Sequence, residues 1–329
     1  QKGHVDTDDL NTAWTIDITM KSVLWLILVL GSSLIATFFE QPELEMALYA
    51  SSVILIINAA KNPGLFLKKQ NFEYGQIFFL SVVQRLSTFI IVIAIAYIER
   101  SYWALIIGDI ISSLIFTIGS YKIDNHKARL CFSQWQKQWS FSFWLLLKGI
   151  IGYTRSQIDT LIVSKFYPPA LLGQYYMARD IAMMPSHNLL SPAIEPLLAA
   201  FKHSREDKIS LEYKVRFSIF IVALASIPIS MFMWFFPQPI IDTLLGAQWK
   251  EAAGLLSALS LLLLYYSFIL VLEQCLLSLK KVKALFWYDV FSLILITAGL
   301  LMMVSNSLES LAYARGILGL FTMIALFIY

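Results

Sequence analysis

Charged residues are scarce in this chain of 329 residues. Asp, Glu, Lys and Arg make up 14% of it, whereas about 25% is usual in a soluble domain. Hydrophobic residues make up 58%, and the mean hydropathy is +0.68. This composition excludes an ordinary soluble domain and predicts an integral membrane protein. Cysteine is also scarce. Cys131 and Cys275 stand far apart, which argues against a disulfide framework and against a cysteine metal cluster.

Strand-like alternation is missing as well, and long apolar runs take its place. A helix needs ~20 apolar residues to cross ~30 Å of hydrocarbon. The sequence therefore predicts an all-α membrane bundle of about ten transmembrane helices. The predicted spans are residues 14–39, 44–67, 75–98, 102–121, 141–164, 170–201, 215–236, 251–279, 284–305 and 308–329.

Both ends of the chain suggest a longer protein. It begins with Gln1 instead of Met, shows no signal-peptide pattern, and stops at Tyr329 inside an apolar run. We expect that both termini of the full protein are missing here.

The basic residues are distributed unequally between the two sets of alternate loops. Of 25 Lys and Arg, 16 fall in loops on one side, 3 fall on the other and 6 lie within spans. Short cytoplasmic loops collect Lys and Arg. The sequence therefore predicts that Gln1 lies on the cytoplasmic side.

A weak internal repeat suggests two lobes. Phe38-Phe39-Glu40-Gln41-Pro42 ends the first predicted span, and Phe235-Phe236-Pro237-Gln238-Pro239 ends the seventh. The span that follows each of them ends in Leu-Lys-Lys. An even number of spans separates the copies, as in parallel repeats of six helices each. We expect residues 1–121 to be the remainder of the N-lobe (four helices, the first two missing), 122–140 a cytoplasmic linker, and 141–329 a six-helix C-lobe with a truncated last helix.

Ionisable side chains form a stripe in the fifth predicted span. Lys148, Arg155 and Asp159 fall within about 40° of one another on a helix. Such a face cannot point at lipid, because each charge there costs at least ~2.5–3.5 kcal/mol. The stripe therefore predicts the wall of a polar pathway or a contact with another helix. Spacing alone leaves open a structural ion pair between Arg155 and Asp159.

Further spans also contain ionisable residues. Arg85 and Arg315 could pair with Asp109, Asp289 or Glu273, and Arg179 is followed directly by Asp180. Pro185 interrupts the sixth predicted span and should kink or break it, either as a flexible gate or as a fixed bend.

The segment 153–200 resembles a known family. It contains Tyr153-Thr154-Arg155-Ser156-Gln157-Ile158-Asp159, then Leu171-Leu172-Gly173-Gln174-Tyr175, then a proline-interrupted helix. This is similar to the seventh and eighth helices of Wzx-type lipid-linked oligosaccharide flippases, which belong to the multidrug/oligosaccharidyl-lipid/polysaccharide (MOP) superfamily. Residues 244–249 and 8–14 resemble further segments of that family. Tyr167-Pro168-Pro169 departs from it, because the family usually has Gly-Pro there.

The resemblance implies a fold and a function. The fold would be a two-lobed, MATE-like transporter bundle in the bacterial inner membrane. The protein would flip undecaprenyl-diphosphate-linked oligosaccharide or polysaccharide units by alternating access through a cationic cavity, without a cofactor and without nucleic acid. Its partners would be the lipid-linked glycan, membrane lipids and other polysaccharide-assembly proteins. The cations assigned to the substrate are Arg155, Lys148, Arg179, Arg85 and Arg315. Asp159, Asp180 and Asp109 become ion-coupling or ion-pair candidates, and Pro185 becomes a gate or kink.

Three other functions compete with this interpretation. A MATE-like ion-coupled exporter of small molecules would share the fold. An enzyme would need a nucleophile or base with partners, yet the four histidines lack metal spacing and no such group of residues is visible. A purely structural membrane protein would have little reason to bury five cations.

Overall fold

The computed structural model describes residues 7–70, 73–126, 128–133 and 135–328, and every regular element in these ranges is helical. The all-α prediction is therefore confirmed. The chain divides into two compact units, residues 1–141 (unit 1) and 142–329 (unit 2), with the boundary inside helix α6 (Trp135–Phe166). The division into transporter lobes remains a prediction.

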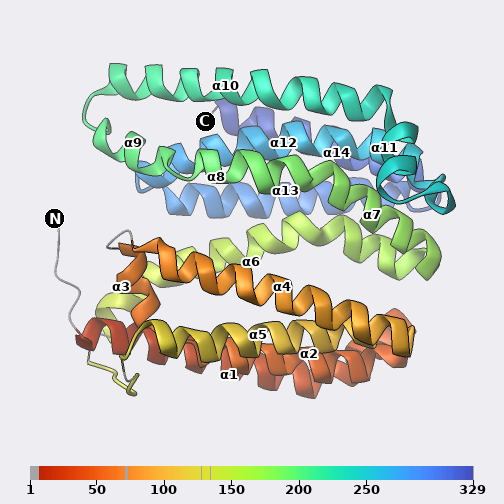
Figure 1. Ribbon diagram of the computed structural model, residues 1–329. Helices are drawn as coiled ribbons and strands as arrows, with labels where there is room; N and C mark the ends of the chain where they lie inside the picture. Colours follow the sequence, from red (N-terminus) through yellow and green to blue (C-terminus); the bar gives the residue numbers. More distant parts are fainter. Residues whose placement is uncertain (1–6, 71–72, 127, 134, 329) are drawn as a thin grey trace. The chain divides into compact units, whose positions relative to one another are not determined.

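Within the described ranges, unit 1 contains five helices before α6. Helix α1 packs against α2, α2 against α5, and α4 against α5 (Figure 1). Their bounds are α1 Thr7–Phe39, α2 Glu43–Ala59, α3 Gly64–Gln70, α4 Tyr74–Glu99 and α5 Trp103–Ile123.

The second predicted span, 44–67, is two helices in the structure. Helix α2 ends at Ala59 and α3 begins at Gly64, directly after Pro63. The break is stabilised by Asn62, whose side chain is buried. Its amide donates hydrogen bonds to the carbonyls of Asp124 and His126, at 2.6 and 3.2 Å, and its Oδ1 accepts one from the Gly64 amide. Pro63 has no backbone N–H with which to continue the helix. The hydrogen bonds of the Asn62 side chain satisfy backbone groups around the break.

Unit 2 is organised around α12. Helices α7, α9, α10, α11 and α14 all pack against it (Figure 1). Leu256 and Ala258, which point to opposite sides of α12, are both fully buried, as expected for a helix that is apolar all round. The elements after α6 are α7 Pro169–Pro185, η1 Ser186–Leu190, α8 Ser191–Ile194, α9 Leu197–His203, α10 Lys208–Phe235, α11 Pro237–Leu244, η2 Ala247–Trp249, α12 Ala252–Ser278, α13 Val282–Met303 and α14 Leu308–Ile328.

The sixth predicted span, 170–201, is also interrupted. Helix α7 ends at Pro185, and the π-helical turn η1 follows it. Pro192 and Pro196 lie within or next to the short helices α8 and α9. Proline removes backbone donors, and π turns accommodate the resulting change in register. The choice between a gate and a fixed bend at Pro185 remains a prediction.

Seven of the helices described by the structure are long and apolar enough to cross a membrane: α1, α4, α5, α10, α12, α13 and α14. The other three predicted spans correspond to α2, α6 and α7. Helices α2 and α7 have only 17 residues each, and α6 contains three charges between Lys148 and Asp159. A multi-pass membrane protein is confirmed, while the count of ten spans remains a prediction.

Candidate functional site

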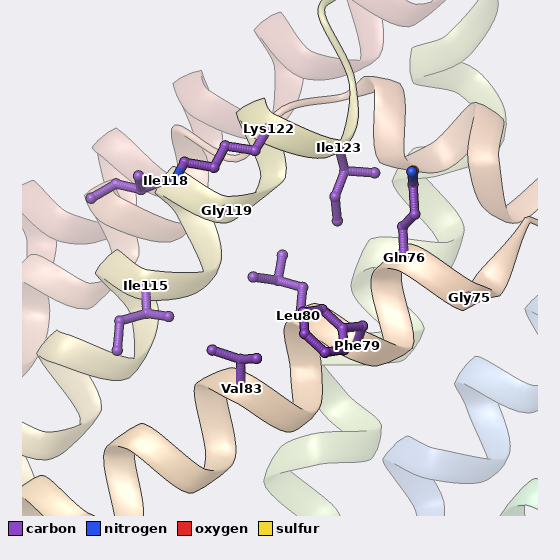
Figure 2. A pocket seen from close by; sticks show the side chains of 10 residues that line it. All are labelled: Gly75, Gln76, Phe79, Leu80, Val83, Ile115, Ile118, Gly119, Lys122 and Ile123. Carbon is purple, nitrogen blue, oxygen red and sulfur yellow. The ribbon is translucent and has the colours of Figure 1, made fainter.

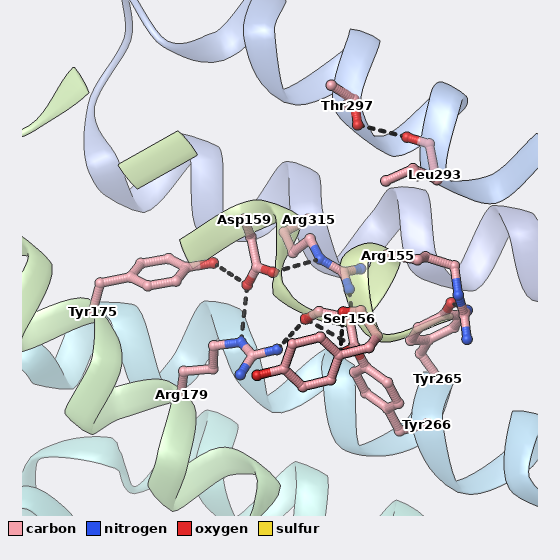
Figure 3. Close-up of polar contacts among 11 residues, drawn as sticks. Arg155, Ser156, Asp159, Tyr175, Arg179, Tyr265, Tyr266, Leu293, Thr297 and Arg315 are labelled. Carbon is pink, nitrogen blue, oxygen red and sulfur yellow. Dashed lines mark hydrogen bonds and ion pairs between the residues drawn. The ribbon is translucent and has the colours of Figure 1, made fainter. Parts of the chain in front are cut away.

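Asp159 is the centre of a buried polar cluster in unit 2. Its carboxylate on α6 is fully buried, and residues from two other helices contact it (Figure 3). Arg179 Nε lies 3.0 Å and the Tyr175 hydroxyl 2.8 Å from Oδ2. Arg315 Nε, on α14, lies 3.4 Å from Oδ1. One carboxylate therefore connects α6, α7 and α14.

The local sequence explains how these side chains meet. Tyr175 and Arg179 are four residues apart on α7, so both point from one face of that helix. Arg315 precedes Gly316, where a Cβ atom would lie 2.8 Å from Leu261 Cβ on α12. The glycine therefore allows α14 to approach α12 closely enough for Arg315 to be fully buried.

Arg155 is the centre of a second group. Its Nε lies 3.0 Å from Asp289 Oδ1 on α13, and its Nη1 donates to the Tyr265 hydroxyl on α12. The rings of Tyr265 and Tyr288 lie 5.6 and 5.5 Å from the guanidinium carbon, within cation–π range. Gly152 lies on α6, three residues before Arg155, and a Cβ atom added there would lie 3.1 Å from Asp289 Oδ2. The absence of a side chain at Gly152 therefore leaves room for the Asp289 carboxylate beside α6.

Lys148 has a partner too. Its ammonium forms an ion pair with Glu273 on α12, and both side chains are mostly buried. Each member of the α6 stripe therefore contacts a different set of helices in unit 2. Packing against neighbouring helices keeps these charges out of lipid.

The pairings correct two sequence interpretations. The structure pairs Arg155 with Asp289 instead of Asp159, because each side chain extends across to a neighbouring helix instead of along α6. Arg315 pairs with Asp159, and not with Asp109, Asp289 or Glu273. Sequence spacing reveals neighbours on one helix but not across helices.

The cluster has more positive groups than negative ones. It contains four cations and three carboxylates, so an excess of one positive charge remains when all are ionised. The buried Nη1 of Arg315 has no hydrogen-bond partner among the described atoms. The arrangement can therefore attract an anionic group. The cations are Lys148, Arg155, Arg179 and Arg315, and the carboxylates are Asp159, Asp289 and Glu273.

Three predicted site residues lie outside this cluster. Arg85 on α4 and Asp109 on α5 belong to unit 1, and both are exposed. No ion pair joins them in the ranges that the structure describes. Asp180 follows Arg179 on α7 but is exposed, because consecutive helical residues point about 100° apart.

Several tyrosines in the cluster were not identified from the sequence. The Tyr266 hydroxyl accepts from Arg315 Nη2 at 3.2 Å and donates to the Ser156 carbonyl at 3.3 Å. Arg179 donates to the same carbonyl (Figure 3). A tyrosine within an apolar helix has no pattern that marks it as a partner of arginine, although the adjacent Tyr265 and Tyr266 are an unusual pair inside so apolar a helix.

An apolar cavity of about 680 Å³ lies in unit 1, between α4 and α5 (Figure 2). Phe79, Leu80 and Ile115 are among its lining residues, with Gln76 and Lys122 as the polar members. It suits an apolar chain, whereas the buried cluster of unit 2 suits an anion.

Comparison with known proteins places this geometry in context. Residues 1–254 match the family described as polysaccharide biosynthesis protein. The succinoglycan biosynthesis transport protein ExoT of Rhizobium meliloti is 20% identical over 263 residues, which cover 78% of this chain and 53% of that protein. The lipopolysaccharide biosynthesis protein WzxC of Escherichia coli is 19% identical over 295 residues, which cover 88% and 60%. The chain thus spans little more than half the length of these relatives.

A solved structure shares the fold. The lipid II flippase MurJ, in its inward closed conformation, superposes with a TM-score of 0.76 at 16% sequence identity. The match covers 98% of this chain and 73% of that one. At this level of identity the likeness establishes the fold alone.

Proposed function

Because the chain belongs to the family of polysaccharide biosynthesis proteins, we propose that the protein flips glycans linked to undecaprenyl diphosphate across the bacterial inner membrane, from the cytoplasmic to the periplasmic leaflet. Two relatives support this proposal: ExoT is named a transport protein, and MurJ is named a lipid flippase. No enzymatic step is needed for this task.

The excess positive charge of the buried cluster is the observation that carries the proposal. A diphosphate is a compact anion, and the planar guanidinium group can donate two parallel hydrogen bonds to phosphate oxygens. Arg155, Arg179 and Arg315 are three such groups on three helices. Asp159 and Asp289 hold them in the state described here. A diphosphate would replace these carboxylates as the partner of the arginines.

Exchange of partners provides a route to alternating access. Each ion pair connects α6 to another helix, so a substrate that competes for the arginines weakens contacts that define this conformation. A ligand shifts a conformational equilibrium by as much as its affinities for the two states differ. Since a buried charge without a partner is costly, the carboxylates and the substrate should occupy the arginines alternately.

Several further features belong to this proposal. Gln1 would be cytoplasmic, residues 1–121 and 141–329 would belong to the two lobes, and other polysaccharide-assembly proteins would be partners. Arg85 would add a cation from the first lobe, and Asp109 an ion-coupling carboxylate. The apolar cavity between α4 and α5 could accommodate an apolar chain.

Deletion of the gene in its native host tests the proposal. In a strain without a redundant transporter, lipid-linked repeat units should accumulate on the cytoplasmic leaflet while their synthesis continues. Complementation with wild type should restore export, and Arg315→Lys should restore it poorly. Arg216→Gln is a matched control, because Arg216 is an exposed arginine on α10 that forms an ion pair with Glu212 one turn away, outside the buried cluster. Normal arrival of lipid-linked glycan at the periplasmic leaflet in the deletion strain would instead favour an ion-coupled exporter of small molecules.

A further inference from the structure

Helix α7 presents two adjacent rows of side chains with opposite environments. Tyr175 and Arg179 form the buried row that contacts Asp159 (Figure 3). Tyr176 and Asp180, each one residue later, form a second row that is exposed, with Tyr176 53% accessible. Because residues four apart share a face, Tyr176 and Asp180 lie side by side, away from the arginine cluster.

The position of Asp180 along α7 is informative. It lies 11 residues after Pro169 (180 − 169), which corresponds to about 16 Å of helix. In the proposed function α7 crosses the bilayer, starting at Pro169. Asp180 then lies near the middle of a ~30 Å hydrocarbon core. No ion pair engages Asp180 within the described part of the chain. An exposed carboxylate at that depth is too costly to face lipid, so this side of α7 must border a water-filled pathway.

The exposed row continues beyond Pro185. His187 and Asn188 lie seven and eight residues after Asp180, in the π turn η1, and both are exposed. The opposite side of the turn, with Ser186 and Leu190, is buried. The exposed side of α7 and η1 therefore carries polar groups at mid-helix and at the break in the helix, with the exposed, apolar Met184 between them.

The chemistry of this row differs from that of the buried cluster. The row contains no Lys or Arg, and Asp180 is negatively charged, so the row lacks the fixed positive charge that attracts a diphosphate to the buried cluster. The Asp180 carboxylate can accept hydrogen bonds from two hydroxyl groups, and the Asn188 amide can both donate and accept. Tyr176 adds an aromatic face and a hydroxyl group on an amphipathic ring. A sugar ring has hydroxyl groups at its rim and apolar C–H faces, which match these donors, acceptors and the aromatic surface.

We propose that Tyr176, Asp180, His187 and Asn188 form a binding surface for the hydroxyl-rich glycan headgroup of the substrate. The inference rests on the proposed function and adds which residues contact the sugar. The two rows of α7 then divide the substrate: the buried row holds the arginine that attracts diphosphate, and the exposed row contacts the glycan.

Binding of two separate probes tests this division. The full protein is reconstituted in lipid nanodiscs and titrated with the repeat-unit oligosaccharide released from the host's own lipid-linked intermediates, or with undecaprenyl diphosphate that carries no glycan. Asp180→Asn and Tyr176→Leu should weaken oligosaccharide binding about tenfold or more, because hydrogen bonds to a charged acceptor and aromatic contact are lost. Both variants should bind undecaprenyl diphosphate like wild type.

A matched control uses another exposed carboxylate. Asp242 on α11 accepts a hydrogen bond from Gln238 at 2.9 Å and lies outside the α7 row. Asp242→Asn should leave the affinity for both probes unchanged. Should Asp180→Asn fail to insert into membranes, Asp180→Glu and Tyr176→Phe support the same comparison, with reduced oligosaccharide affinity expected for each.

The outcomes separate the two proposals. If wild type binds both probes and Asp180→Asn keeps its oligosaccharide affinity, the glycan surface is overturned. If Asp180→Asn keeps that affinity but loses the pH or sodium dependence of export, Asp180 is an ion-coupling residue, and the glycan surface is again overturned. If wild type binds neither probe, the proposed function itself fails.

Discussion

Arg155 and Asp289 form an ion pair inside unit 2, with 3.0 Å between Arg155 Nε and Asp289 Oδ1. The two residues belong to α6 and α13, which are far apart in sequence. Both side chains are almost completely buried, and the Tyr265 hydroxyl oxygen accepts a further hydrogen bond from the Arg155 guanidinium. The pair connects the charged stripe of α6 to the rest of unit 2. Changes in the free energy of this ion pair should therefore alter both the stability of the protein and glycan export.

Removing one partner of this pair should destabilise the protein strongly. Asp289→Leu alone, or Arg155→Met alone, leaves a buried charge unpaired and should cost about 3–5 kcal/mol of unfolding free energy. The double variant, with both substitutions, should regain most of that loss, since no buried charge remains unpaired. The unfolding temperatures of the three variants are measured in detergent, with size-exclusion chromatography as the readout of the folded fraction.

The control for this cycle is the surface pair Asp17–Lys21 on α1. Its side chains are 49% and 28% exposed, so Lys21→Met should cost at most about 1 kcal/mol. A double variant of Arg155 and Asp289 that is as unstable as either single variant would show that the residues do not act as a pair.

Arg155→Lys should keep the charge but impair export. An ammonium cannot reproduce the planar fork that contacts Asp289 and Tyr265 together, nor hold a diphosphate bidentately. Export of glycan and the amount of membrane-inserted protein are measured in the same cells. Normal abundance with normal export would remove Arg155 from the substrate path, whereas low abundance would assign it a structural role.

Cys131 should react rapidly with maleimides from the cytoplasmic side. Hydrogen bonds from Ser133 stabilise the thiolate and hold the pKa of Cys131 below its usual value. A lower pKa means that more thiolate is present at pH 7 than in an ordinary cysteine, and the thiolate is the reactive form. In a Cys275→Ser background, a membrane-impermeant maleimide should label inside-out vesicles and leave intact spheroplasts unlabelled. The reverse pattern would invert the predicted topology.

Ser133→Ala tests the cause of this reactivity. Loss of the hydroxyl should raise the pKa of Cys131 toward its ordinary value, so labelling at pH 7 should become slower. At a pH well above that value both proteins carry the thiolate, and their rates should converge. An equal rate at pH 7 would mean that Ser133 does not stabilise the thiolate.

Gly316→Ala should destabilise unit 2 by about 1–3 kcal/mol, because the added methyl group would lie 2.8 Å from Leu261 Cβ and would push α14 away from α12. Gly149→Ala on α6 is the control, since among the described residues no atom beyond its own stretch of helix lies within 4 Å of the new Cβ. Helix propensity favours alanine at both sites. The difference between their unfolding temperatures therefore isolates the contact between α12 and α14, and equal temperatures would contradict it.

Much of this architecture follows from the sequence alone. Scarce charge and recurrent apolar runs predicted an all-α membrane protein, and the structure confirms it. The motif around Arg155 and Asp159 resembled a family of polysaccharide flippases, and the match over residues 1–254 confirms that the chain belongs to the family of polysaccharide biosynthesis proteins. The positions at which helices break were harder to predict from the sequence. Pro185 was recognised as an interruption of the sixth span, whereas Pro63 in the second was not, because its effect depends on the partners that Asn62 finds on α5 and beyond.

The sequence by itself determined that Lys148, Arg155 and Asp159 share a helix face and must avoid lipid, since helix periodicity and the cost of charge in hydrocarbon are properties of the local sequence. Only the tertiary structure decided their partners. Asp289 on α13 and Arg315 on α14 reach partners on α6, where Gly152 leaves room for the Asp289 carboxylate, while Gly316 allows α14 to approach α12 closely. Partner choice depends on distances between helices far apart in the chain, and no spacing within one helix encodes those distances.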